Sequence, residues 1–152
     1  MKKQQLLNKI EQAWTLFKGS YAGLTDKELL EPGVTGDWSV KDILAHVSWW
    51  EEEALKHLPH ILQGGRPPRY SVLYGGIDAF NLQMTEKKRS LTLSEVKERM
   101  DATHLRLVAY VQSAPEEQLA SDTRFRRRLR LDTYSHYPIH ERAIREWRER
   151  SA

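Results

Sequence analysis

Two histidines stand four residues apart near the end of the chain, in the stretch DTYSHYPIHERAIREW at 132–147. Residues four apart on a helix share a face, with Cβ atoms about 5 to 6 Å from each other. His136 and His140 could therefore direct two imidazoles to one metal ion. Ile144 and Trp147 continue the same face at helical spacing, which predicts that both imidazoles point into the protein interior.

A third imidazole would complete a metal site, and His46 is the candidate. It lies in the most apolar helical segment, on a face shared with Ile43 and Trp50. Taken alone, His46 is more simply explained as a core histidine hydrogen-bonded to the backbone. Together with His136 and His140 it would supply three neutral nitrogen ligands and leave positions open for water or substrate, as in catalytic zinc sites. Such a site should lose its metal below about pH 6, near the ordinary histidine pKa.

Pro138 constrains where the last helix begins, because a proline inside a helix removes a backbone hydrogen bond and is tolerated only in the first turn. We expect the helix to begin near 133–135, which would place His136 in its opening turn. A helix that began only at Pro138 would direct His136 elsewhere.

The remaining ligand chemistry is limited by what the chain lacks. It has no cysteine, so imidazole and carboxylate are the strong ligand types, and any thiol chemistry would need a thiol from another molecule. The other three histidines sit among charged or turn residues and are interpreted as surface or boundary side chains: His57, His60 and His104.

Composition predicts a single globular domain over residues 1–152, since 39% of the residues are apolar and 30% are charged. The 24 basic and 21 acidic residues are interspersed, which argues against a surface built for nucleic acid. No apolar run reaches the roughly 18 residues that cross a membrane, and the first residues lack a signal-peptide core, so we expect a cytoplasmic protein.

Apolar residues recur at three- and four-residue steps in several segments, which predicts an all-α fold. We expect helices at 4–24, at 40–63 with Ser39 as its N-cap, in a broken third helix over 79–89 and 95–113, and in the last segment. Asp78 and either Thr92 or Ser94 are the expected caps of the broken helix. Four such helices predict a four-helix bundle, whose interior is a usual place for a metal site.

The connections differ in length. Residues 64–76, GGRPPRYSVLYGG, are long for a link between bundle neighbours and predict a crossover between helices two and three. Residues 114–121 are expected to form a short helical turn, and 122–131, DTRFRRRLRL, an extended strap or a short strand, because Arg and apolar residues alternate there.

Three pieces of the chain resemble the DinB/YfiT-like superfamily of four-helix-bundle metalloenzymes: GDWSVKDILAHVSWWE, DAFNLQ and DTYSHYPIHERAIREW. The pattern Trp-Ser-x-x-Asp-x-x-x-His followed late by His-x-x-x-His is similar to the ClbS/DfsB branch and to the metal-binding domain of mycothiol-dependent maleylpyruvate isomerases. The family's three metal ligands match His46, His136 and His140. The resemblance also implies a divalent ion, zinc or nickel, a low-molecular-weight thiol such as bacillithiol or mycothiol, a homodimer, and Asn81 and Tyr134 as substrate-binding candidates.

These features favour a metal-dependent thiol S-transferase or related detoxifying enzyme that acts on a small-molecule electrophile. Metal-dependent hydrolysis uses the same ligands and stays open, as does a non-enzymatic small-molecule-binding or stress-resistance protein. Trp50 could line the substrate pocket, and Glu53 could contact substrate or the ligands, or could simply pair with His57 on the helix surface. The arginines of the strap, Arg126, Arg128 and Arg130, could hold carboxylates of the thiol, or could be a solvated basic segment.

Overall fold

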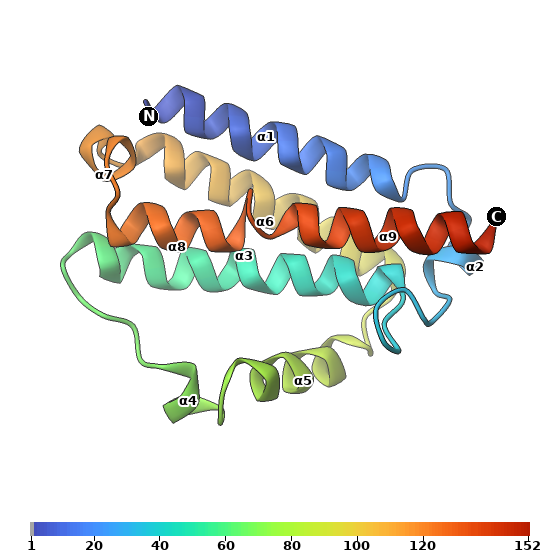
Figure 1. The fold of residues 1–152 in the computed structure, drawn as a ribbon. Coiled ribbons are helices and arrows are strands. Elements are labelled where there is room, and N and C mark those ends of the chain that lie inside the picture. The colour runs from blue at the N-terminus through green and yellow to red at the C-terminus, as the bar shows by residue number, and fades with distance from the viewer. Residues whose placement is uncertain (1) are drawn as a thin grey trace.

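Four long helical rods form the protein, and the computed structural model describes residues 2–152 (Figure 1). The first three rods are α1 (Lys3–Ser20), α3 (Val40–Leu62) and α6 (Leu93–Ser113), and the fourth is made of α8 (Arg124–Asp132) and α9 (Tyr137–Ser151) placed end to end. Shorter helices join them: α2 (Asp26–Leu29), α4 (Tyr70–Leu73), α5 (Ile77–Lys88) and α7 (Glu116–Ala120). Over residues 2–152 there is no strand, so the expected all-α four-helix bundle is confirmed.

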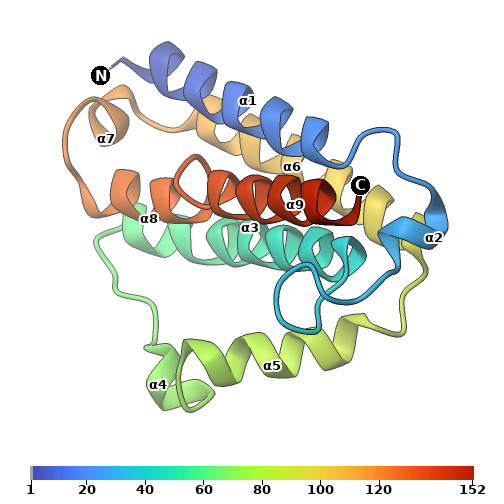
Figure 2. The same ribbon diagram turned by 45° about the vertical axis from the view of Figure 1, so that its right-hand side comes forward.

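α3 is the central rod of the bundle. It packs against α6 and α8 and carries α5 on its outer side, while α1 packs against α9 (Figures 1 and 2). Its side chains are buried around most of its circumference, which explains why this segment is the most apolar helix of the sequence. No helix over residues 2–152 is long and apolar enough to cross a membrane.

The helix starts follow the capping residues of the sequence. Ser39 and Thr92 each accept a hydrogen bond from the backbone N–H three residues on, in the reciprocal capping box. The sequence predicts Asp78 as the N-cap of α5, but Asp78 lies in the first turn of that helix. Gly76 holds the cap position with φ +121°, a backbone conformation that favours glycine.

The crossover between the second and third rods, α3 and α6, is longer than the sequence predicts, because α5 belongs to it. α4 and α5 run along the outer side of α3, away from α1, and α6 alone forms the third rod (Figure 2). The helices expected at 79–89 and 95–113 are both present, as α5 and α6, but they do not form one broken third helix, so that part of the expectation is wrong. The broken rod is the fourth.

α8 replaces the extended strap expected at 122–131. Thr123 accepts a hydrogen bond from the backbone N–H of Arg126, which caps a helix, and Phe125 and Leu129 are fully buried one turn apart. The alternation that suggested a strand depends on Leu131, whose side chain is in fact 60% exposed. The true period of the segment is that of a helix.

The fourth rod is interrupted at 133–136, where Thr133 has φ −128° and ψ −106° and ends α8. α9 begins at Tyr137, two or more residues later than expected, with His136 at the N-cap position and Pro138 in the first turn. The proline is tolerated there because the first N–H groups of a helix have no partner within the helix.

Candidate metal centre

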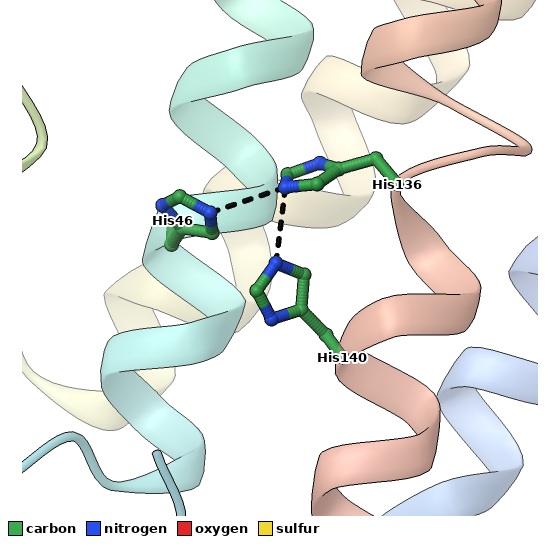
Figure 3. A group of neighbouring side chains, drawn as sticks. All are labelled: His46, His136 and His140. Carbon is green, nitrogen blue, oxygen red and sulfur yellow. Dashed lines mark hydrogen bonds between the residues drawn. The ribbon is translucent and has the colours of Figure 1, made fainter. Parts of the chain in front are cut away.

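Three imidazoles meet where α3 faces the interruption of the fourth rod (Figure 3). His46 comes from α3, His136 from the junction between α8 and α9, and His140 from the first turn of α9. Nε2 of His136 lies 3.1 Å from Nε2 of His46 and 3.0 Å from Nε2 of His140. Although α9 begins late, His136 still joins the other two.

The spacing of these nitrogens is suited to one metal ion. Candidate ligand atoms of the three residues all lie within 4.8 Å of one another. Zinc–nitrogen bonds of about 2.0 to 2.1 Å in tetrahedral geometry place two ligand nitrogens roughly 3.3 Å apart, close to the two Nε2 separations. The three histidines could therefore hold a metal ion with small shifts of the rings.

Burial keeps the triad neutral. Removal from water lowers the pKa of His46 to about 2, assisted by repulsion from His140 and His136. The pKa of His136 falls to about 3, by burial and then by repulsion from His140, and burial lowers that of His140 to about 4. Neutral imidazole is the form that binds a metal, so protons do not compete for these ligands near neutral pH.

The far nitrogens of the three rings are also buried. Nδ1 of His46, His136 and His140 has no hydrogen-bond partner among residues 2–152. Metal-binding histidines commonly donate this N–H to a carboxylate or carbonyl, which fixes the ring. For His46, ring packing takes that role, since Trp38 lies 4.8 Å and Trp49 4.9 Å from its ring, measured between centroids.

A cavity of about 460 Å³ opens beside the triad and is lined by His46 and His136 on one side. Trp50 and Asn81, both candidates from the sequence, also line it, and Nε1 of Trp50 donates to Oδ1 of Asn81 at 3.0 Å. Its size falls within the roughly 300 to 1,000 Å³ typical of small-molecule sites. Three imidazoles beside a cavity of this size can present a metal ion to a small molecule.

A family model that matches most of the chain identifies the family. The DinB superfamily model matches residues 9–142, which include all three histidines. The chain belongs to the DinB superfamily. A comparison with curated proteins finds no match.

Solved structures of the same fold resemble this DinB protein closely in shape and distantly in sequence. The colibactin self-resistance protein ClbS, in complex with double-stranded DNA, is 17% identical with a TM-score of 0.80, over 95% of this chain and 94% of that one. The sibling lethal factor precursor DfsB is 16% identical with a TM-score of 0.80, over 99% and 97%. A Streptococcus pneumoniae protein is 17% identical with a TM-score of 0.81, over 98% and 91%.

Glu53 stands one layer behind the cavity wall of this DinB protein. Its Oε1 accepts a hydrogen bond from the Tyr70 hydroxyl at 2.8 Å and lies 3.5 Å from Nε2 of His57. Tyr70 lines the cavity and Glu53 does not, so Glu53 can influence the cavity only by holding the Tyr70 hydroxyl. Tyr70 itself lies in a link rich in glycine and proline that has no periodicity, so no sequence pattern indicated its role.

Tyr134 does not reach the cavity. The turn of the chain after Thr133 places it in a groove between α1 and α9, with Nζ of Lys9 5.5 Å from its ring centre. The resemblance suggested Tyr134 as a substrate-binding residue, but the structure brings it together with neither the histidines nor Asn81.

A second polar cluster lies inside the bundle. His104 is 5% exposed, stacks on Trp14, and contacts Glu51 through Nδ1 at 3.0 Å and Glu11 through Nε2 at 2.8 Å. Burial raises the pKa of Glu51 to about 7. Burial would lower the pKa of His104, but its bonds to Glu51 and Glu11 outweigh that effect and raise it.

The surface interpretation is therefore wrong for two of the other three histidines. His57, like His104, is 5% exposed, and His60 alone of the three is exposed. Both buried imidazoles contact carboxylates. The partner of His57 is Glu53, one turn away on the same helix, which the spacing indicates, whereas Glu51 lies 53 residues from His104 and cannot be recognised as its partner from local composition.

Proposed function

We propose that this DinB protein is a divalent-metal-dependent enzyme that joins a low-molecular-weight thiol to a small electrophile, in detoxification. The observation that carries the proposal is the convergence of three neutral imidazoles beside a cavity of about 460 Å³. A structural metal site is normally closed by four protein ligands, whereas three ligands leave room for a small molecule.

Each residue has a role in this proposal. His46, His136 and His140 hold the ion, zinc or nickel, which when bound lowers the pKa of a coordinated thiol or water. Trp50 and Asn81 contact the substrate, and Glu53 positions Tyr70. The chain has no cysteine, so the thiolate comes from a cofactor such as bacillithiol or mycothiol. The cytoplasm, where small thiols are kept reduced, is the proposed compartment.

Metal-dependent hydrolysis is the related alternative, because it would use the same three ligands and the same cavity with water in place of the thiol. Product analysis distinguishes the two: a transferase forms a thiol adduct of the electrophile, and a hydrolase forms no adduct when the thiol is added.

A DNA-associated or ligand-sequestering resistance protein is the second candidate. ClbS is described as a self-resistance protein and its structure contains double-stranded DNA. In the present chain, α8 carries exposed Arg127 and Arg130, which could contact phosphates. DNA affinity that falls steeply with salt, and that is lost when both arginines are replaced, would favour this candidate.

A homodimer also belongs to the proposal. Leu16 on α1 and Ile139 on α9 are 56% and 62% exposed, and these two helices pack against each other. Burial of such residues against a second copy would remove apolar surface from water. Sedimentation of the wild type and of the Leu16→Glu variant tests it: a dimer that becomes a monomer supports it.

Elemental analysis of the purified, untagged protein tests the metal site itself. We expect close to one divalent ion per chain in the wild type and in the His60→Ala control. His60 is exposed and is not one of the three candidate ligands. His46→Ala and His140→Ala should lose the ion while keeping the helical circular dichroism of the wild type. Absence of metal in the wild type, after incubation with zinc or nickel, would refute the proposal.

A further inference from the structure

The cavity beside the triad has a polar side that the metal site does not use. Arg128 and Asp132, one turn apart on α8, line it together with Tyr70 and Asn81. Of the five arginines on α8, Arg128 is the one that lines this cavity, whereas Arg127 pairs with Asp122 at the surface. The sequence could not separate these arginines, because an extended strap would have placed Arg126, Arg128 and Arg130 alike on one side.

Arg128 is held in place at two points. Its Nε donates to Oδ2 of Asp132 at 2.7 Å, and its Nη2 donates to the Tyr70 hydroxyl at 3.1 Å. Tyr70 is tied in turn to Glu53. The side chain of Arg128 is only 17% exposed. A guanidinium fixed in this way loses little conformational freedom when a further partner binds.

Only one of the two hydrogen-bonding edges of the Arg128 guanidinium is used. A guanidinium has five N–H donors, and the two bonds above occupy the edge formed by Nε and Nη2. The Nη1 group and the second Nη2 hydrogen, which form the other edge, have no partner among residues 2–152. Two parallel N–H groups on one edge match the two oxygens of a carboxylate.

Asn81 adds donors of the same kind. Asn81 lines the cavity, and its Oδ1 accepts from Trp50, while its amide N–H groups have no partner in the described chain. Among the lining residues the charges of Arg128 and Asp132 cancel, and the histidines are neutral. A divalent ion at the triad would make this cavity positive, and the unused donors would then favour an anionic acceptor.

We propose that Arg128 determines the specificity of this cavity by binding the carboxylate of a small molecule whose reactive end lies at the three histidines. The inference rests on the proposed metal-dependent function and narrows its substrate class to carboxylate-bearing thiols or electrophiles. Asp132 and Tyr70 are positioning residues that hold the guanidinium with one edge free.

Cobalt-loaded protein provides a direct test, because a thiolate that binds cobalt produces a charge-transfer absorption band. The probes are mercaptopropionate, mercaptobutyrate and mercaptohexanoate, each compared with the mercapto-alcohol of the same length. We expect the wild type to bind at least one of the acids about tenfold or more tightly than its alcohol, as a charge-assisted bidentate contact implies. The alcohols measure binding of the thiol without the carboxylate.

Variants separate this role from a structural one. Removing Arg128 alone would leave Asp132 buried without its partner, so the informative variant is Arg128→Met with Asp132→Asn, which keeps the local charge balanced. It should bind the same amount of cobalt and the same alcohols, and lose the preference for acids. Arg127→Met, on the same helix and at the surface, should keep that preference.

The outcomes are distinct. Wild-type protein that binds cobalt and shows no preference for any acid overturns the inference and leaves the metal site intact. A preference that persists in the double variant also overturns it, since another group would then bind the carboxylate. Wild-type protein that takes up no cobalt refutes the proposed function and the inference together.

Discussion

Replacing all three histidines of the triad with glutamine should make the metal-free protein less sensitive to acid. The folded-state pKa values of about 2, 3 and 4 for His46, His136 and His140 lie below the ordinary value of about 6.5. Between pH 6.5 and 4 the unfolded chain therefore binds protons at these residues that the folded chain does not. The free energy of unfolding must fall as the pH falls through this window.

The magnitude follows from the shifts. On going from pH 7.5 to 5.5, each neutral buried histidine should cost about 1.4 kcal/mol of stability, so the three together should cost about 4 kcal/mol. Glu51 and Asp132 act in the opposite direction, because burial raises their pKa values to about 7 and about 6. Both carboxyls are present in the wild type and in the variant, so their contribution cancels in the difference between the two proteins.

Urea unfolding of the chelator-treated proteins, followed by circular dichroism at pH 7.5 and 5.5, measures this difference. We expect the wild type to lose about 4 kcal/mol more than the triple variant between the two pH values. Equal losses would show that the imidazoles are protonated in the folded state, and that burial does not lower their pKa values. The same pKa shifts change the expectation that metal is lost below about pH 6. In the folded protein the three histidines stay unprotonated down to about pH 4, so metal loss at a higher pH would result from unfolding.

Three further predictions concern stability. A divalent ion at one hundred times its dissociation constant should stabilise the wild type by about 2.7 kcal/mol in thermal or urea unfolding, and should leave His46→Ala unchanged. Ser39→Ala should cost about 1 kcal/mol, because it removes the side-chain acceptor of the Asp42 N–H, and metal content per folded chain should stay the same. His104→Ala should cost about 3 to 5 kcal/mol in urea unfolding at pH 8, since it leaves fully buried Glu51 without its partner; a cost below 1 kcal/mol would contradict a buried ion pair.

The sequence predicts the parts of this fold that depend on local signals. Capping at Ser39 and Thr92 and the apolar period of the long helices follow from side chains within a few residues of each other. The three candidate metal ligands were also predictable as a group, because His136 and His140 share a helical spacing and His46 stands in an apolar helix. Pro138 limited the start of α9 to within a few residues of its true position.

The errors come from features that local pattern cannot contain. α8 is short, and one exposed leucine, Leu131, gives it a false alternation. α5 has only two fully buried side chains and almost no preferred face, so periodicity does not indicate whether it belongs to the bundle or lies outside it. His104 and Arg128 have roles set by partners on other helices, which become neighbours only when the chain has folded.

The candidate ligands His46 and His136 are separated by 90 residues of sequence, and they meet across the bundle. An unfolded chain would have to close a loop of that length to bring them to one ion, at a substantial cost in chain entropy. Metal bound to all three imidazoles would therefore report on long-range folding as well as on the site. In any set of variants, the metal content per chain should measure the fraction of molecules that have completed the bundle, including variants whose substitutions lie far from the histidines.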